Sequence, residues 1–331
     1  MTNVFQGKNI LVTGGTGSIG SEIVKTVLQH KPEVVRVLSN DENSLFSLGQ
    51  ELQSYSNARF LVGDIRDKER LARAMKGIQF VFHAAALKHV ALCEYNPFEA
   101  VKTNVLGTQN VIEVAMEEGV DKFITISTDK AVSPTNVMGA TKLLAERLTI
   151  SASHYRGHRK TAFSCVRFGN VLDSRGSVVP LFKEQIENGG PVTITDPNMT
   201  RFVMSIPKAV ELVLKAVEVA RGSEIFIFKM PALRVGDLAE VMISELAPRY
   251  GYNPKDIKIK VIGKREGEKN HEELLTEDEA TSAYETAGMF IIAPTARNRK
   301  GGKTPVRRYT SNDGKLLSKA AIQKLLRQAS E

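Results

Sequence analysis

An acid and an amine stand side by side in the segment Ser127-Thr128-Asp129-Lys130, which directly follows a predicted buried strand. A carboxyl group and an amine held close together can divide proton transfers between them, one acting as the acid and the other as the base. Lysine serves as a base when burial or cationic neighbours lower its pKa. The pair therefore predicts acid–base chemistry. The plainer alternative is a helix cap or a surface ion pair.

A glycine-rich loop lies between the first predicted strand and the first predicted helix. Its residues are Thr13, Gly14, Gly15, Thr16, Gly17, Ser18, Ile19 and Gly20. The first glycines permit a tight turn and a close approach of the backbone to a pyrophosphate, and Gly20 lets the helix pack on the sheet. The helix N-terminus then faces the phosphates. We predict a dinucleotide site contacted by Gly14, Gly17, Ser18, Ile19 and Gly20, with a purely structural turn as the alternative.

The end of the second strand bears on the choice between NAD and NADP. NAD enzymes usually carry an acid there that binds the ribose 2′-hydroxyl, but this strand ends in Ser39, followed by Asn40 and Asp41. Asp41 either reaches back to the ribose or caps the next helix. No arginine stands nearby in the sequence to hold a 2′-phosphate. We predict NADP, with NAD as the alternative. Further cofactor contacts are expected from Ser39, Asn40, Asp41, Asp64, Ile65, Ala84 and Ala85.

The elements that must position these groups alternate between short apolar runs and amphipathic stretches. This alternation predicts an α/β fold with a Rossmann-type doubly wound parallel sheet. Strands are expected at 9–12, 34–38, 59–62, 80–83, 123–127 and 162–168, and helices at 21–30, 42–55, 68–75, 97–118 and 138–155. Sites gather at the carboxyl ends of the strands in such sheets, which is where the glycine loop and Asp129 fall.

Glycine and proline become denser after about residue 171, which suggests a second unit. We predict a dinucleotide-binding domain over 1–171 and a smaller C-terminal α/β substrate-binding lobe with a tail over 172–331. The chain is expected to rejoin the sheet at about 205–235, through a helix at 207–220 and a strand at 224–229. An amphipathic helix at 315–328 should close the chain.

Composition narrows the class of protein. With 331 residues, 42% of them hydrophobic, the chain can bury a large core. Its two cysteines, Cys93 and Cys165, argue against a disulfide framework and favour a reducing cytoplasm. A signal peptide and a membrane span are not expected, because no apolar run is long enough.

The net charge of +8 suits phosphorylated ligands. Nucleic acid is not an expected partner, because no recognition motif accompanies the charge. The densest basic group reads as a solvated tail and comprises Arg297, Arg299, Lys300, Lys303, Arg307 and Arg308.

The run from Ser127 to Lys142 resembles the extended short-chain dehydrogenase/reductase superfamily. That superfamily pairs a Ser or Thr after this strand with Tyr-x-x-x-Lys on one face of the next helix. Here the tyrosine position holds Met138, which cannot transfer a proton. In this respect the chain is similar to the short form of the UDP-N-acetylglucosamine 4,6-dehydratases of polysaccharide, capsule and flagellin-glycan biosynthesis, some of which carry Met here. The same resemblance runs through 84–90, 103–108, 167–171, 199–204 and 265–269.

The resemblance implies a lyase reaction on a UDP-sugar: oxidation at C4, loss of water across C5 and C6, and return of the hydride to C6. Asp129 would protonate the departing C6 oxygen, and Lys130 would remove the C5 proton. Thr128 would bind the C4 oxygen, and Lys142 would hold the nicotinamide ribose. The group that deprotonates the C4 hydroxyl stays open in the absence of the tyrosine, as does retention or inversion at C5.

Substrate contacts are expected where the resembling motifs carry charge or face the sugar. The predicted residues are Lys88, His89, Met138, Asn170, Lys183, Arg201, Arg265 and Glu268. Arginine forks suit the diphosphate oxygens. No metal is expected. The resemblance also implies a homo-oligomer, either a dimer or a hexamer.

Two alternatives compete with this interpretation. A nucleotide-sugar 4-epimerase of the same superfamily would keep the tyrosine and need no Asp–Lys pair, so Met138 and Asp129-Lys130 argue against it. A catalytically inactive Rossmann protein that only binds the cofactor is favoured by the missing tyrosine. The retained Lys142, Asp129 and Lys130 argue against that reading.

Overall fold

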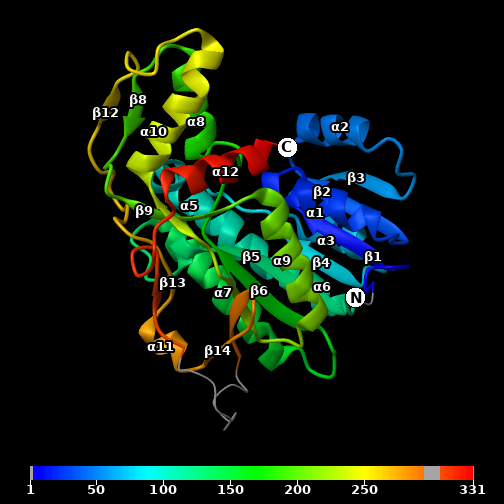
Figure 1. Ribbon diagram of the computed structural model, residues 1–331. Helices are drawn as coiled ribbons and strands as arrows, with labels where there is room; N and C mark the ends of the chain where they lie inside the picture. The colour runs from blue at the N-terminus through cyan, green and yellow to red at the C-terminus, as the bar shows by residue number, and fades with distance from the viewer. Residues whose placement is uncertain (1–2, 294–305, 331) are drawn as a thin grey trace.

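The structure is a computed structural model that describes residues 3–293 and 306–330, and its centre is a nine-stranded sheet (Figure 1). The strand order is β14-β15-β10-β6-β5-β4-β1-β2-β3. The bounds are β1 (Asn9–Thr13), β2 (Val34–Ser39), β3 (Ala58–Val62), β4 (Phe80–His83), β5 (Lys122–Thr128), β6 (Ala162–Phe168), β10 (Ile225–Phe228), β14 (Ala283–Glu285) and β15 (Met289–Ile292). The strands from β3 to β10 pair in parallel, and β15 and β14 add antiparallel at one edge. The predicted Rossmann-type doubly wound fold is confirmed.

Helices cover both faces of the sheet, because each buries one apolar side against it. One face carries α1 (Ser18–Gln29), α2 (Glu42–Glu51) and α9 (Ile206–Val219), whose buried side chains share a core with the sheet. The other face carries α3 (Lys68–Met75), α6 (Thr108–Glu117) and α7 (Val137–Tyr155). The central strands are therefore apolar on both sides, as buried parallel strands require.

The single helix expected over 97–118 is divided into three parts. It consists of α5 (Pro97–Ala100), the π-helical turn η1 (Val101–Gly107) and α6, and the short helix α4 (Val90–Tyr95) precedes it. The π turn carries Asn104, whose side chain accepts from the Leu87 amide at 2.8 Å and donates to the Leu87 carbonyl at 2.9 Å. Its amide also donates to Thr141 Oγ1 at 3.0 Å. The irregular turn thus ties the loop after β4 to α7, and such turns often accompany functional sites.

A second core lies outside the main sheet, in the chain after β7 (Asn170–Val171). In two small sheets, β9 (Thr200–Met204) pairs with both β7 and β11 (Ala232–Arg234), and β8 (Val192–Ile194) pairs with β12 (Ile259–Val261). Three helices pack around them, namely α8 (Val178–Glu187), α10 (Val235–Leu246) and α12 (Lys319–Ser330). The remaining elements are η2 (Asp129–Ala131), η3 (Ala247–Tyr250), α11 (Glu277–Ala280), β13 (Glu273–Leu275) and β16 (Tyr309–Thr310). Figure 1 shows this lobe above the carboxyl ends of the strands.

The structure also differs from the expected division into a dinucleotide-binding domain and a C-terminal lobe. Besides β10, the strands β14 and β15 also join the main sheet, although they lie in the stretch expected to form the lobe and tail. Of the basic group expected to form a tail, Arg297, Arg299, Lys300 and Lys303 lie outside the described residues. No helix in the described ranges 3–293 and 306–330 is long and apolar enough to cross a membrane.

Candidate active site

The glycine loop has the geometry that a bound pyrophosphate needs. Gly14 has φ +64, and a Cβ on it would come within 2.6 Å of the Ala85 backbone. A Cβ on Gly20 would collide with the carbonyl oxygen of Gly14. Helix α1 starts after Gly17, and among the described residues no side chain caps its first turn. The free amides of this turn and the space kept clear by glycine fit a dinucleotide phosphate.

The end of β2 shows how Ser39 and Asp41 are used. Ser39 is buried, and its hydroxyl hydrogen-bonds the Thr16 hydroxyl at 2.8 Å. Asp41 caps α2 by accepting from the Ser44 amide at 3.0 Å, and the hydrogen bonds from Ser44 lower the pKa of Asp41. The carboxylate is therefore engaged as a helix cap, as the plainer interpretation of Asp41 holds.

An arginine lies beside the glycine loop and the start of α2, although the sequence around β2 contains no arginine placed to hold a 2′-phosphate. Arg175 comes from the loop after β7 and lies exposed. Its guanidinium donates to the Thr16 carbonyl and to Ser44 Oγ at 3.5 Å, and its amide donates to Ser18 Oγ at 3.0 Å. Sequence reasoning missed it because only the fold brings this loop to β2.

The other predicted cofactor residues line the same edge of the sheet. Asp64 follows β3, where Arg66 donates to its carboxylate at 2.7 Å and lowers its pKa. Asn40 donates to the same carboxylate at 3.4 Å. Ile65 is buried beside Gly107, on which a Cβ would come within 2.7 Å of its side chain. Ala84 and Ala85 follow β4 against the glycine loop, where the Ala84 amide donates to the Thr13 carbonyl at 3.0 Å.

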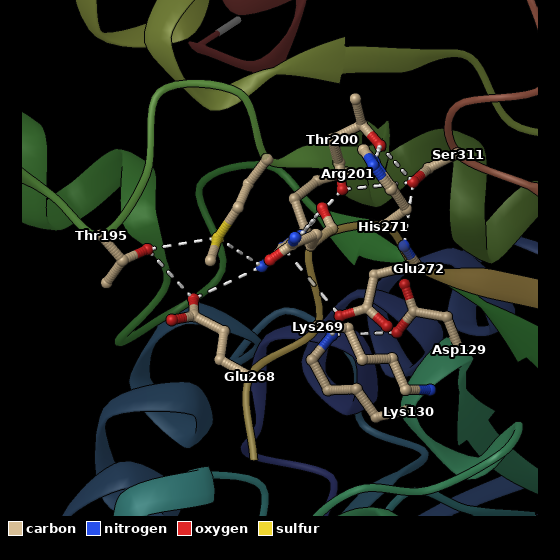
Figure 2. Close-up of polar contacts among 12 residues, drawn as sticks. Asp129, Lys130, Thr195, Thr200, Arg201, Glu268, Lys269, His271, Glu272 and Ser311 are labelled. Atoms are coloured by element: carbon tan, nitrogen blue, oxygen red, sulfur yellow. Dashed lines mark hydrogen bonds and ion pairs between the residues drawn. The ribbon is translucent and has the colours of Figure 1, made fainter. Parts of the chain in front are cut away.

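The predicted acid and base lie in contact at the end of β5, where η2 begins (Figure 2). Lys130 Nζ donates to Asp129 Oδ1 at 2.9 Å, and Thr128 Oγ1 donates to the same oxygen at 2.9 Å. Asp129 is completely buried, whereas 24% of the Lys130 side chain is exposed. A Cβ on Gly169 would lie 2.9 Å from Asp129 Oδ2, so glycine leaves room for the carboxyl group.

A second buried carboxylate, Glu272, joins this pair and was not predicted. Its Oε1 lies 3.5 Å from Lys130 Nζ and 4.0 Å from Arg201 Nε, and its side chain is 4% exposed. The only signal in the sequence is its position just beyond the motif at 265–269. Arg201 also contacts Glu268, with 3.4 Å between Nη2 and Oε1.

The charges of this cluster set the protonation of its members. Burial raises the pKa of Asp129 by more than Lys130 lowers it. Burial alone would lower the pKa of Lys130, but the negative charges of Asp129 and Glu272 outweigh it and raise that pKa. Burial would raise the pKa of Glu272, yet the charges of Lys130, Arg201 and Lys269 lower it. The condition under which a lysine serves as a base, a lowered pKa, is therefore not met by this arrangement of charges, because two carboxylates face the amine of Lys130.

Hydrogen bonds hold the segment that carries Glu272 over the end of β5. Thr135 Oγ1 donates to the Gly267 carbonyl at 2.7 Å, and Lys269 Nζ donates to the Val132 carbonyl at 2.6 Å. The Glu272 amide donates to Ser311 Oγ at 2.9 Å. Ser311 in turn bonds the backbone and hydroxyl of Thr200 on β9. The position of Glu272 is thus fixed from both sides (Figure 2).

On helix α7, Lys142 makes a polar contact with β5, whereas Met138 packs among apolar side chains. Lys142 Nζ donates to the Ile126 carbonyl at 2.7 Å, and burial lowers the pKa of Lys142. Met138 is buried in a small apolar cluster with Cys93 and Ala100. At the tyrosine position of the superfamily motif, this chain has a packed side chain.

The remaining predicted substrate residues fall into two groups. Lys88 Nζ donates to the Arg175 carbonyl at 2.6 Å, and the His89 ring lies against Gly176, so both border the loop after β7. Asn170, on β7, keeps a buried Oδ1 without a partner among the described residues. Arg265 and Lys183 are exposed in the second lobe. The Arg265 amide donates to Glu268 at 3.2 Å, whereas Lys183 on α8 takes no part in the ion pairs recorded among the described residues.

Several buried polar atoms around the pair have no hydrogen-bond partner within residues 3–293 and 306–330. They include Asp129 Oδ2, Glu272 Oε2, Ser127 Oγ and Asn170 Oδ1. Buried polar atoms are normally satisfied, since an unsatisfied one costs about 1–3 kcal/mol. Two of these oxygens belong to the carboxylates that contact Lys130, Asp129 and Glu272, and unpartnered oxygens there fit a polar ligand.

Known proteins match this chain along its whole length. The model of a family described as polysaccharide biosynthesis protein matches residues 10–294. An uncharacterised membrane protein of Methanocaldococcus jannaschii is 62% identical, over 100% of this chain and 98% of its own length. A UDP-N-acetylglucosamine 4,6-dehydratase (inverting) of Campylobacter jejuni is 44% identical over 89% of this chain and 85% of its own. A UDP-glucose 4-epimerase of Rickettsia akari is 38% identical over 98% and 96%.

Solved structures show the same fold. The X-ray structure of Pen from Bacillus thuringiensis is 48% identical, with a TM-score of 0.92 over 98% of each chain. The dTDP-glucose 4,6-dehydratase DesIV of Streptomyces venezuelae, with NAD and TYD bound, has a TM-score of 0.73 over 96% of each chain. At 21% identity, DesIV supports the fold alone.

Proposed function

Since the chain belongs to the polysaccharide biosynthesis protein family, we propose that it is a UDP-N-acetylglucosamine 4,6-dehydratase that dehydrates its substrate with the Asp129–Lys130 pair. The resemblance indicated by the sequence motifs is confirmed: the chain is a nucleotide-sugar dehydratase or epimerase of the short-chain dehydrogenase/reductase superfamily. The observation that carries the finer proposal is the buried carboxyl group of Asp129 in contact with Lys130, at the sheet edge that also holds the glycine loop.

The proposed reaction converts the substrate to UDP-2-acetamido-2,6-dideoxy-hexos-4-ulose. A nicotinamide cofactor on the glycine loop would supply the acceptor of the C4 hydride and its donor to C6. Burial raises the pKa of Asp129 and so favours its protonated form, which would give its proton to the departing C6 oxygen. Lys130 takes the C5 proton, and Thr128 hydrogen-bonds the C4 oxygen. Lys142 binds the nicotinamide ribose.

The cofactor proposed is NADP. Ser39 is not an acid, and the carboxylate of Asp41 is engaged with Ser44. Arg175 offers a guanidinium at the same place, where it would pair with a 2′-phosphate. NAD is the alternative, and it would need Asp41 to leave its cap and bind the ribose.

The substrate diphosphate would bind to the cationic side chains of the second lobe and the strand edge. We assign this role to Arg201 and Arg265, with Lys183 as a more distant cation. Lys88 and His89, in the loop after β4, and Asn170, on β7, would contact the sugar or the diphosphate. Glu268 would orient Arg201. Met138 would contact the sugar only at the margin of its apolar cluster.

We propose a homo-oligomer, a dimer or a hexamer, built on α4, α5 and η1. Four large apolar side chains on these consecutive helices are more than half exposed, namely Leu92, Tyr95, Phe98 and Leu106. Exposed apolar patches of this kind mark protein interfaces. Sedimentation of the Tyr95→Asp variant should give a smaller species than the parent, and an unchanged mass would rule out this face.

A 4-epimerase is the second candidate, favoured by the 38% identity to the Rickettsia akari enzyme. Against it, Met138 cannot exchange a proton with the C4 hydroxyl. Mass spectrometry separates the two: dehydration lowers the mass of UDP-N-acetylglucosamine by one water, whereas epimerisation leaves it unchanged. Because hydride leaves and returns within one cycle, dehydration should proceed without consuming added cofactor.

A further inference from the structure

Glu272 is a buried carboxylate that the roles assigned so far do not use. Its Oε1 is 3.5 Å from Lys130 Nζ, and its Oε2 has no partner among the described residues. Thr200, Ser311 and Lys269 fix the segment around it, so its approach to Lys130 is built into the fold. Burying a carboxylate is costly unless opposite charges lie close to it, and Glu272 Oε1 lies near both Lys130 and Arg201.

The pair alone has a difficulty in carrying out the proposed reaction. Lys130 Nζ lies 3.5 Å from the buried Glu272 carboxylate, whose negative charge favours the protonated amine, so Lys130 cannot take the C5 proton until it has lost its own. Asp129 cannot receive that proton while it holds the one destined for the C6 oxygen. A third group must therefore accept the proton of Lys130 at the moment of C5 deprotonation.

We propose that Glu272 is this third proton-holding group, a positioning residue that accepts the proton of Lys130 Nζ and so converts the amine into the C5 base. The inference rests on the proposed dehydratase function. No other carboxylate within residues 3–293 and 306–330 forms an ion pair with Lys130 besides Asp129.

The proton count closes over one turnover. Before dehydration, Asp129 is protonated, Lys130 is cationic and Glu272 is anionic. A proton moves from Lys130 Nζ to Glu272, the neutral amine takes the proton from C5, and Asp129 gives its proton to the C6 oxygen as the C6–O bond breaks and water leaves. Lys130 later returns a proton to C5 when hydride reaches C6, and Glu272 then gives its proton back to the neutral amine. The proton released by the C4 hydroxyl at the first oxidation replaces the one lost in water, so no proton is gained or lost overall.

Arg201 stabilises the anionic form of Glu272 before the reaction. Its Nε lies 4.0 Å from Glu272 Oε1, and its positive charge helps hold Glu272 ionised before reaction. Glu272 therefore sits between two cations. It can take a proton from one of them while the other limits how long that proton stays.

The test compares Glu272→Gln with Glu273→Gln and Glu272→Asp. Glutamine keeps the shape of the side chain but cannot hold the extra proton. Glu273 is the matched control, because it is the next residue and pairs with Arg308 at 2.6 Å and with Ser133, but not with Lys130. In Glu272→Asp the carboxylate is kept, so this variant should retain part of the dehydration activity that Glu272→Gln loses. Thermal melting of all three variants separates folding from chemistry.

The first readout needs no substrate. NMR titration of Lys130 Nζ should give a lower pKa in Glu272→Gln, because a negative charge that raises it has been removed, and an unchanged pKa in Glu273→Gln. The second readout is exchange of the C5 proton with deuterated solvent. In Glu272→Gln it should fall about 10²-fold, together with dehydration, while formation of reduced cofactor changes little. The pH–rate profile should move to lower pH, since the pKa values of Asp129 and Lys130 both fall.

The outcomes separate this inference from the function it rests on. If the parent enzyme releases no water from UDP-N-acetylglucosamine, the proposed function fails, whatever the variants do. If the parent is active and Glu272→Gln exchanges the C5 proton as fast as the parent or faster, Lys130 needs no acceptor and the inference is overturned. A loss in Glu272→Gln confined to KM, with the parental pH profile, would also overturn it.

Discussion

Two clusters of buried charged side chains, one around Arg167 on β6 and one around Lys130 after β5, differ in how completely their hydrogen bonds are made. In the first, the Arg167 guanidinium is 1% exposed and donates five times: to Glu146 at 3.0 and 2.7 Å, to Glu279 at 2.9 and 3.0 Å, and to the Leu274 carbonyl at 3.0 Å. Every donor of the fork has an acceptor.

The second cluster, Asp129, Lys130, Glu272 and Arg201, is nearly as buried but incomplete. One oxygen of each carboxylate, Asp129 Oδ2 and Glu272 Oε2, lacks a partner within residues 3–293 and 306–330. A closed network rigidifies a fold, whereas open positions in a buried network are sites where a ligand or a proton can be received. The comparison therefore assigns Arg167, Glu146 and Glu279 to structure, and the end of β5 to chemistry.

Substitutions in the open cluster should have the largest effect on activity. Asp129→Asn removes the acid and Lys130→Ala the base, so each should slow dehydration about 10²–10⁴-fold, as loss of positioned acid–base groups does. Met138→Ala should do less harm, because it removes packing and no proton-transfer group. Rates of water loss, measured together with melting curves, give the ordering.

The melting temperature of each variant is the control, because it separates a loss of chemistry from a loss of folding. Asp129→Asn should not lower the melting temperature at neutral pH, because the folded state binds the proton of Asp129 more tightly than the unfolded chain, so ionisation of this carboxyl favours unfolding. A Met138→Ala variant that stays folded and is as inactive as Asp129→Asn would break the assignment. So would a Lys130→Ala variant with parental C5 exchange.

A substitution in the Arg167 cluster should lower stability and leave catalysis nearly unchanged. Arg167→Met leaves Glu146 and part of Glu279 buried without their partner and should destabilise the fold by about 3–5 kcal/mol. Residual folded protein should keep kcat within a small factor of the parent. Denaturant unfolding measures the loss, and a variant of parental stability would contradict the view of this network as structural.

Arg175 provides an exposed counterpart with the smallest expected effect. Arg175→Ala should weaken NADP binding about tenfold and leave NAD binding nearly unchanged, corresponding to about 1.4 kcal/mol for one exposed charged contact. Because the side chain is exposed, the melting temperature should not change. Titration of both cofactors against cofactor-free protein tests this. Tighter binding of NAD than of NADP by the parent would show that Asp41 reaches the ribose.

Elements defined by their local sequence could be predicted, whereas features that depend on contacts between distant segments could not. Strand β4 and helix α3 match their expected bounds, since hydrophobic periodicity and a capping Asp67 define them locally. The break at η1 was missed because it depends on Asn104 reaching the loop after β4. The helices α8 and α10 were missed in a stretch where glycine and proline obscure the periodicity.

The candidate site divides in the same way. The contact of Lys130 with Asp129 follows from adjacency at a strand end, and the structure places it there. The protonation of Lys130 does not follow from adjacency, because it depends on Glu272, which a distant segment brings within 3.5 Å. Arg175 likewise reaches the glycine loop only through the fold. Motifs locate the reacting groups, and tertiary contacts set their charge.

The measurement that tests the central claim most directly is the mass change of UDP-N-acetylglucosamine incubated with the protein in deuterated water. The account predicts a product lighter by one water, with solvent deuterium at C5, and neither change with Asp129→Asn. A substrate recovered at unchanged composition, or an epimer formed equally well by Asp129→Asn, would contradict it.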